Sequence, residues 1–235
     1  MTPGVHVWLA PEALAEDPAT APKLQALLSD DELAQQQRFA VESPRRQHLV
    51  ARALQRTVLS HFVPSVAPCD WRFEIHEKGR PFIASGQAPG LDFNIAHTVG
   101  MVVMAAGFEV RVGVDVEALA RRRSMEIARR YFSSREIAGL EALPVDAQAR
   151  RFLELWTLKE AYLKAIGTGI AGGLGTMTFD LDGGGIAFER AADPDAARWR
   201  FHQRPAGETH LVALACMGDA TSDDPVTWHE AAFAA

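Results

Sequence analysis

The chain has little of what crosslinked, thiolate-bound or membrane-spanning proteins depend on. Its two cysteines, Cys69 and Cys216, belong to no CxxC pair, which argues against a disulfide framework and against a thiolate metal site. The longest apolar run, 101–107, is far shorter than the roughly 20 residues that span a bilayer. The first residues hold neither a basic segment nor a long apolar run, so no signal peptide is expected. We therefore expect a cytoplasmic protein without a membrane partner.

Positive charge is also in short supply. The 235 residues include 24 lysines and arginines against 30 acidic residues, and the net charge of -6 argues against a nucleic-acid partner. Only four of the 24 are lysines, and two of these, Lys159 and Lys164, fall in one short segment. Apolar residues make up 48% of the chain, which is ordinary for a soluble globular protein and suffices for one large domain or two small ones.

Hydrophobic periodicity and capping signals predict both strands and helices. Alternation or short apolar runs predict strands at Val5–Leu9, Trp71–His76, Leu91–His97, Met101–Phe108 and Val110–Glu117. Capping residues and helical spacing predict helices from Ser29 to about Ala40, from Ser43 to about Phe62, from Ser133 onward, and from Asp146 to Ile166, where Gly167 ends the last one. The remainder, Leu174–Trp228, is predicted to be rich in strands.

The order of the elements suggests two halves of similar layout. A strand, helices and strands are followed by helices and strands, and the seam falls near residues 111–123. We therefore expect an α/β (α+β) fold whose two halves, 1–111 and 112–235, form one compact unit. Because the seam carries several carboxylates, a cleft between the halves is expected to hold the site.

Two acidic residues share one face of the strand that is predicted at the seam. Side chains alternate along a strand, so Asp115 and Glu117 lie on the same face as Gly113, which leaves room beside them. Two carboxylates on one face repel each other unless a cation lies between them, and a hard divalent ion takes oxygen ligands of this kind. The alternative is a strand end with two solvated acids.

A stripe of three side chains follows the long helix predicted at residues 146–166. Trp156, Glu160 and Lys164 are spaced i, i+4 and i+8, so they lie on one face. Glu followed by Lys at i+4 is also a common surface salt bridge, and core packing explains Trp156 at least as well as a substrate contact does. The many apolar neighbours indicate a largely buried helix, in which a Glu and a Lys need a reason.

Several basic side chains are candidates for binding an anion. His97 ends a predicted strand next to a turn, where an imidazole either binds phosphate or is satisfied by backbone groups. The further candidates are Arg80 in the turn before a strand and Arg45, Arg46 and Arg52 on a predicted helix, although each is just as easily a surface charge. The arginine run 121–123 is either a solvated loop or a dock for an acidic partner.

Five segments between residues 77 and 169 are informative as a set. They are Glu77-Lys78-Gly79-Arg80-Pro81, Phe93-Asn94-Ile95-Ala96-His97, Val112-Gly113-Val114-Asp115-Val116-Glu117, Arg130-Tyr131-Phe132-Ser133, and Trp156 through Lys164 followed by Gly167-Thr168-Gly169. In order and separation they resemble the 4′-phosphopantetheinyl transferases of the surfactin-synthetase-activating (Sfp-like) type. The motifs G-[IV]-D-x-E and W-x-x-K-E-x-x-x-K are specific together, whereas each alone is weak.

The resemblance implies a fold, a reaction and partners. The implied fold has two similar α/β halves related by a pseudo-twofold axis, with coenzyme A in the cleft between them. The implied reaction moves the 4′-phosphopantetheine arm of coenzyme A to a serine of an apo acyl or peptidyl carrier protein and releases 3′,5′-ADP. The implied cofactor is Mg²⁺, with Mn²⁺ as an alternative ion, and the protein is expected to be a monomer.

The resemblance also implies roles for individual residues. Asp115, Glu117 and Glu160 would hold the metal ion against the pyrophosphate. Glu160 would accept the proton of the serine hydroxyl, directly or through a metal-bound water, and Lys164 would neutralise the charge that develops. By match of position, Arg80 and His97 would bind the phosphates of coenzyme A.

The first half departs from the family pattern. Glu32 and Gln35 stand where members of this type often carry lysines. Arg45 or Arg46 is therefore expected to compensate in binding the phosphates of coenzyme A, and Gln47 and His48 stand near the position that meets adenine.

Two other functions fit the same residues. A non-catalytic module of the same fold would bind coenzyme A or a carrier domain without releasing 3′,5′-ADP. A hydrolase of nucleotide pyrophosphates would release product without a protein acceptor. The complete set of acids favours the transferase over the binding module.

Overall fold

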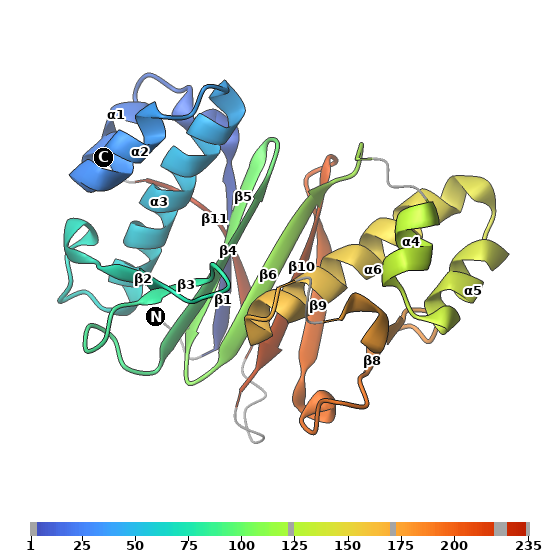
Figure 1. The fold of residues 1–235 in the computed structure, drawn as a ribbon. Helices are drawn as coiled ribbons and strands as arrows, with labels where there is room; N and C mark the ends of the chain where they lie inside the picture. Colours follow the sequence, from blue (N-terminus) through green and yellow to red (C-terminus); the bar gives the residue numbers. More distant parts are fainter. Residues whose placement is uncertain (1–3, 122–124, 170–172, 219–224, 234–235) are drawn as a thin grey trace.

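The computed structural model describes residues 4–121, 125–169, 173–218 and 225–233. Within these ranges the chain folds into four layers in the order helix, sheet, sheet, helix (Figure 1). The first sheet has the strand order β11-β1-β5-β4, and the second has the order β6-β10-β9. Helix α3 packs on the outer face of the first sheet and α6 on the outer face of the second, while the two inner faces pack against each other. The predicted mixed α/β fold is confirmed.

The bounds of most elements follow the periodicity of the sequence. The strands are β1 (Val5–Pro11), β2 (Phe73–Ile75), β3 (Pro81–Ile83), β4 (Leu91–Thr98), β5 (Met101–Phe108), β6 (Arg111–Ala118), β7 (Thr178–Asp180), β8 (Ala187–Glu189), β9 (Arg200–Ala206), β10 (His210–Met217) and β11 (Val226–Glu230). The helices are α1 (Ala21–Ala26), α2 (Asp30–Gln37), α3 (Glu42–Phe62), α4 (Met125–Tyr131), α5 (Ser134–Ala142) and α6 (Val145–Ile166). The sequence signals did not predict α1, α4 or β3, because these elements span only one or two turns or three residues.

Strand β5 contributes to two cores at once. Val102 and Met104 face α3, whereas Val103 and Ala105 face the second sheet, and all four side chains are fully buried. A strand with apolar residues at every position satisfies both faces, which is the arrangement expected from its sequence.

Local capping signals in the sequence are confirmed at three helix ends. At the start of α2, the Ser29 hydroxyl accepts from the backbone of Glu32 while the Glu32 carboxylate accepts from the backbone of Ser29. Ser133 and Glu136 form the same reciprocal pair at the start of α5. Gly167 ends α6 in the left-handed conformation, with a φ of 68°.

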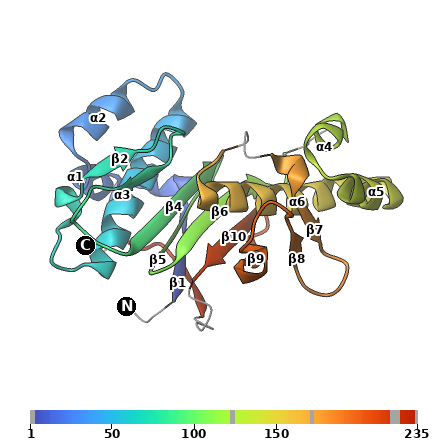
Figure 2. The same cartoon turned by 60° about the horizontal axis from the view of Figure 1, so that its bottom comes forward.

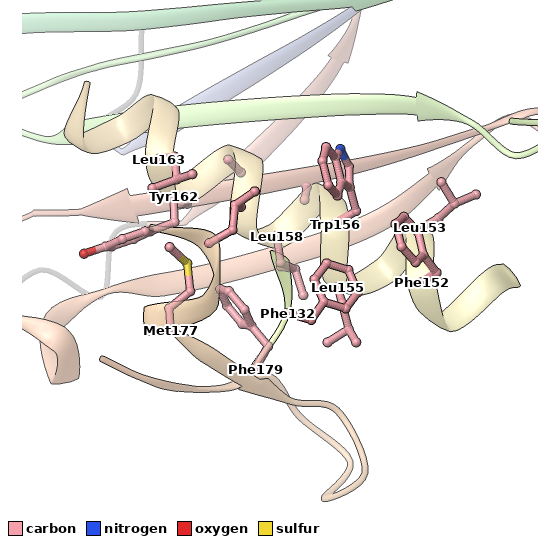
Figure 3. Packing of buried hydrophobic residues seen from close by; sticks show 14 of the residues in the cluster. Phe132, Phe152, Leu153, Leu155, Trp156, Leu158, Tyr162, Leu163, Met177 and Phe179 are labelled. Atoms are coloured by element: carbon pink, nitrogen blue, oxygen red, sulfur yellow. The ribbon is translucent and has the colours of Figure 1, made fainter. Parts of the chain in front are cut away.

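Helix α6 is buried along most of its length. Its side chains Phe152 and Tyr162, in different turns of the helix, are only 2% and 1% exposed. Figure 3 shows Phe132, which follows α4, and Phe179 of β7 packed against this helix. The hairpin of β7 and β8 and the helices α4 and α5 lie on the same side of the second sheet as α6 (Figure 2).

The two sheets meet at a seam between β4 and β6, where side chains take the place of backbone acceptors. Oδ2 of Asp92 accepts a hydrogen bond from the Val112 amide at 3.0 Å, and Oδ1 of Asn94 accepts one from the Val114 amide at 2.9 Å. From the first bond to the second, the acceptor residue on β4 and the donor residue on β6 both advance by two positions, so the two strands run parallel. The seam thus fixes β6, which carries the predicted acids, against the first half.

The last strand returns to the first sheet. Strand β11 pairs with β1 in parallel, with Val7 opposite Trp228, so residues 226–230 complete the first sheet. The division into 1–111 and 112–235 stays a prediction, and β11 crosses it. None of the helices in the described ranges combines the length and the hydropathy that crossing a bilayer requires.

Candidate active site

A cleft of about 680 Å³ opens beside β6 and α6. Acidic, basic and aromatic side chains together line it: Asp115, Glu117, Glu126, Glu160, His97, Arg121, Arg130, Tyr131 and Trp156. They come from the end of β4, from β6 and the residues after it, from α4 and from α6. Four residues predicted for the site, namely the three acids and His97, therefore lie in one cleft.

The close packing of α6 on β6 depends on Gly113. A Cβ atom at this position would lie 2.1 Å from the carbonyl oxygen of Ala161, so only glycine fits. The close approach places Lys164 of α6 beside Asp115 of β6, with 2.6 Å between Nζ and Oδ1. The room that the sequence predicts beside the acids is thus taken up by the helix itself.

Asp115 carries an unusual carboxylate. Only 6% of the residue is exposed, and its second oxygen, Oδ2, is buried without a hydrogen-bond partner among the described residues. Burial raises the pKa of this carboxyl, and the attraction of Lys164 offsets only part of the rise. A buried oxygen of this kind is a free acceptor for a cation.

The second acid of β6 is held by a different cation. The Glu117 carboxylate is 5% exposed, and Nη1 of Arg121 lies 2.8 Å from its Oε2 and 3.2 Å from its Oε1. Arg121 itself is about half exposed at the cleft. Arg122 and Arg123, the other members of the predicted arginine run, lie outside the described residues.

The stripe on α6 faces the cleft at two of its three positions. Glu160 is half-buried there, and Trp156 also lines the cleft while it belongs to the core, with a stacked contact to Phe152 at 5.8 Å. The third position, Lys164, pairs with Asp115. Spacing of i, i+4 and i+8 therefore predicted the face of the helix correctly.

The acids do not surround a metal ion as they stand. Within the described ranges, no three His, Cys, Asp or Glu side chains are gathered closely enough to hold one. The two β6 carboxylates are held by Lys164 and Arg121 instead. The donor set still fits Mg²⁺, because carboxylate oxygens line one cleft and Oδ2 of Asp115 has no hydrogen-bond partner in the part of the chain that the structure describes.

Two histidines lie where positive charge is concentrated. Partial burial lowers the pKa of His97, and the charges of Lys164 and Arg52 lower it further. The pKa of His48, on α3, is lowered by burial and then by Arg52, and both of its ring nitrogens are buried without a hydrogen-bond partner among the described residues. Both imidazoles are thus neutral near pH 7 and are suited to take up a proton when an anion binds.

Arg80 is placed differently from the expectation. Its guanidinium donates to both oxygens of Asp92 at 2.8 and 2.9 Å and to four backbone carbonyls, those of Lys164, Ala165, Phe93 and Val112. It lines a separate cavity of about 740 Å³ rather than the cleft of the acids. Arg80 therefore joins the C-terminal end of α6 to the seam and has few donors left for a phosphate.

The arginines of α3 also divide into different roles. Arg46 pairs with Glu12 at 2.9 Å and with Glu16 at 2.5 Å, and Nη2 of Arg45 donates to a backbone carbonyl at 2.6 Å. Neither lines the cleft. The charge of Arg52 lowers the pKa of both His48 and His97, so this α3 arginine acts on the two histidines.

Some residues at the site had no predicted role. Arg130 and Tyr131 line the cleft from α4, with the guanidinium carbon of Arg130 5.3 Å from the Tyr131 ring centroid. Their segment contributed to the family resemblance, which was the one signal available for them. Glu12, whose buried carboxylate lies outside the cleft, also gave no signal, because the partners of that carboxylate are at least 31 residues away in sequence.

Comparisons with known proteins match the chain to one family. The family model of the 4′-phosphopantetheinyl transferase superfamily matches residues 111–215, and that of the 4′-phosphopantetheinyl transferase N-terminal region matches residues 18–109. The 4′-phosphopantetheinyl transferase HetI of Nostoc is 35% identical over 169 residues, which cover 71% of this chain and 70% of that protein. A phosphopantetheinyl transferase of Thraustochytrium is 31% identical over 94% of this chain and 81% of its own length.

Two further matches cover less of the chain. The 4′-phosphopantetheinyl transferase Sfp of Bacillus subtilis is 31% identical over 63% of this chain and 64% of its own length. Among solved structures, the holo-[acyl-carrier-protein] synthase of Thermotoga maritima covers 48% of this chain and 65% of its own, at 22% identity and a TM-score of 0.40.

Proposed function

This chain belongs to the 4′-phosphopantetheinyl transferase superfamily, and on that premise we propose how its own residues carry out the transfer. The phosphopantetheine arm of coenzyme A moves to a serine of an apo acyl or peptidyl carrier protein. The serine oxygen attacks the phosphorus next to pantetheine, the bond from that phosphorus to the bridging oxygen breaks, and 3′,5′-ADP leaves.

One observation carries this proposal. Asp115, Glu117 and Glu160 line the same cleft, with Lys164 bonded to the first of them. Phosphoryl transfer requires positioning and charge neutralisation more than covalent chemistry. A cleft with three carboxylates beside a lysine supplies the sites for a divalent cation and for a basic contact to the leaving pyrophosphate oxygen.

Asp115, Glu117 and Glu160 would hold Mg²⁺, with Mn²⁺ as an alternative ion. The ion would neutralise charge on the pyrophosphate. Of the three acids, Glu160 belongs to α6 and the other two to β6. We assign Glu160 the role of accepting the proton of the attacking serine hydroxyl. Lys164 would exchange part of its contact with Asp115 for an oxygen of the pyrophosphate as charge develops there.

The contacts of the basic residues favour a particular set for coenzyme A. His97 lies at the cleft, His48 has two buried ring nitrogens without partners among the described residues, and Arg52 is close enough to lower the pKa of both. We assign the phosphates and the adenosine of coenzyme A to this group. The bonds of Arg80, Arg45 and Arg46 to protein acceptors favour an indirect role for these three.

Partners and setting complete the proposal. The partner would be an apo carrier domain, and the protein would act as a monomer in the cytoplasm. A non-catalytic module of the same fold is the alternative, and the complete acid set in the cleft speaks against it.

A direct assay separates these functions. The protein is mixed with coenzyme A, Mg²⁺ and several apo carrier domains, and the carriers are weighed by mass spectrometry. We expect a mass gain of one phosphopantetheine group on at least one carrier, and none on a carrier whose acceptor serine is replaced by alanine. Glu160→Gln and excess chelator serve as controls. Release of 3′,5′-ADP without any carrier would indicate a hydrolase, and coenzyme A binding without release would indicate a binding module.

A further inference from the structure

The turn between β4 and β5 is held more firmly than a hairpin tip usually is. It contains Val99 and Gly100 and follows His97 by two residues. Val99 is 70% exposed, so its own side chain anchors nothing. Two buried side chains from distant parts of the chain bind the turn instead, and both bind the peptide group between Val99 and Gly100. Glu12 binds its amide and His210 its carbonyl oxygen.

Glu12 binds the turn from the first half. Its Oε2 accepts from the Gly100 amide at 2.9 Å, and its own amide donates to the Gly100 carbonyl at 3.0 Å. The same carboxylate accepts from three side chains at the start of α3: Ser43, Arg46 and Gln47. Glu12 is only 5% exposed, and although burial raises the pKa of its carboxyl, these hydrogen bonds together hold it below the ordinary value.

His210 binds the turn from the second half. Its Nε2 lies 2.8 Å from the carbonyl oxygen of Val99, and its Nδ1 lies 2.9 Å from the Thr209 hydroxyl. A carbonyl oxygen only accepts, so Nε2 carries the proton in this arrangement. Gly100 has a φ of 90°, and a Cβ there would lie 3.2 Å from Cε1 of His210, so the turn and the imidazole are in close contact.

The two contacts bear on both histidines that we assign to coenzyme A. Gln47, which donates to Glu12 at 3.1 Å, immediately precedes His48 on α3, and Gly100 lies three residues after His97. A single buried carboxylate therefore ties the segment that carries His48 to the segment that carries His97. His210 adds a bond from the sheet that carries the acids, because β10 pairs with β6.

We propose that Glu12 and His210 are positioning residues that set His97 and His48 in the geometry that binds coenzyme A. The inference rests on the proposed function. Neither residue lines the cleft, so each acts through the turn and α3 rather than on the substrate. A binding group held in place before the ligand arrives loses less freedom on binding, which is why misplacement of such groups costs affinity.

The chain offers a matched control. Glu16 also pairs with Arg46, at 2.5 Å, but it is 56% exposed as a side chain and no described bond joins it to Gly100. Glu12→Gln and Glu16→Gln remove the same charge from the same arginine. Only the first changes the bond to the turn.

The first experiment measures binding of coenzyme A by titration calorimetry, with no carrier present. We expect Glu12→Gln and His210→Phe to weaken binding about 10- to 100-fold, and Glu16→Gln to leave it unchanged. His210→Gln, which keeps a donor for the Val99 carbonyl, should recover part of the loss. In ¹⁵N-histidine spectra the His97 signals should move in Glu12→Gln and stay in place in Glu16→Gln.

A measurement on the wild type covers the case in which the variants fail to fold. The proposal requires slow hydrogen exchange at the Gly100 amide, at a hairpin tip where fast exchange is the rule. Fast exchange there overturns it, and so do unchanged affinity and unchanged His97 signals in both Glu12→Gln and His210→Phe. A wild type that binds no coenzyme A would instead contradict the proposed function, so the two failures are distinct.

Discussion

Oδ1 of Asn94 accepts a hydrogen bond from the backbone amide of Val114 across the seam between the two sheets, at 2.9 Å. The amide belongs to the residue just before Asp115, so this bond sets the position of the first acid of the site. Asn94 is the only asparagine in the chain and is 5% exposed. A side-chain carbonyl thus does here what a backbone carbonyl does inside a sheet.

Replacing Asn94 by leucine should destabilise the protein by about 1–3 kcal/mol, because the Val114 amide is left buried without an acceptor. Transfer activity should fall as well, because β6 carries Asp115. Urea unfolding measures the first effect and the carrier mass assay the second. Asn94→Asp keeps an acceptor oxygen and should retain more stability than Asn94→Leu. Equal stability of wild type and Asn94→Leu would show that the seam does not depend on this bond.

The two acids of β6 should control the metal requirement. Asp115→Asn and Glu117→Gln keep the size of each side chain but remove a negative ligand, so the Mg²⁺ concentration for half-maximal transfer should rise steeply in both. Mn²⁺ binding, followed by electron paramagnetic resonance, should weaken in parallel, and a chelator should abolish wild-type transfer. Circular dichroism checks that the fold persists. Normal transfer by either variant at low millimolar Mg²⁺ would remove that acid from the metal site.

Glu160→Gln tests the base. Glutamine matches the size of glutamate but accepts no proton, and a lost general base typically costs about 10²–10⁴ in rate. We expect most of the transfer to disappear while coenzyme A still binds in part, as measured by single-turnover kinetics and calorimetry. Glu154→Gln is a suitable control, because Glu154 lies on the same helix in a salt bridge with Arg150. Near-normal turnover of Glu160→Gln would leave Glu160 without a role as base.

Much of the site could be predicted from local patterns. Period-two alternation placed Asp115 and Glu117 on one face of β6, and helical spacing placed Trp156 and Glu160 on the face of α6 that meets the cleft. These predictions succeeded because a regular strand or helix fixes where its side chains point. Capping boxes succeeded for the same reason, since both partners lie within one turn.

What could not be predicted depends on residues far apart in sequence. Glu12 meets Gly100 across 88 positions, and Arg80 meets the carbonyl of Lys164 across 84. No local pattern specifies such a pair, because the tertiary packing of other elements brings its members together. For this reason the sequence did not indicate the protein acceptors of Arg80, and its contact with a phosphate of coenzyme A stays a prediction.

The lowered pKa of His97 leads to a pH dependence of coenzyme A binding. Burial, Lys164 and Arg52 keep the free imidazole neutral near pH 7. A phosphate at this site would raise that pKa, so binding would take up a proton between the free and the bound pKa, and affinity should increase as the pH falls through this window. The preference for coenzyme A over dephospho-coenzyme A should therefore be larger at pH 6.5 than at pH 8. His97→Ala should abolish the difference, and an equal loss for both ligands would place His97 away from the 3′-phosphate.

The two lysines of α6 should respond in opposite ways to the same substitution. Nζ of Lys159 is fully buried, 2.7 Å from the Glu136 carboxylate and 2.7 and 2.8 Å from the carbonyls of Leu174 and Met177. Lys164 is 30% exposed as a side chain and bonds to Asp115 at the cleft. Lysine to methionine keeps the length of the chain and removes the charge in both cases. At Lys159 it removes the cation beside buried Glu136 and the donor to two buried carbonyls. At Lys164 it removes the cation beside Asp115, whose carboxyl has a pKa that burial already raises and can take up a proton instead.

We therefore expect Lys159→Met to lower the free energy of unfolding by about 3–5 kcal/mol, the usual cost of removing one partner of a buried ion pair. Lys164→Met should change stability far less, yet it should lose most of the transfer, because we assign this lysine the contact to the pyrophosphate. Urea unfolding and the carrier mass assay distinguish the two effects. Replacing Lys159 and Glu136 together by methionine and leucine should restore part of the stability, since no unpaired charge remains. A Lys159→Met protein as stable as wild type would contradict the structural role, and full transfer by Lys164→Met would contradict the catalytic one.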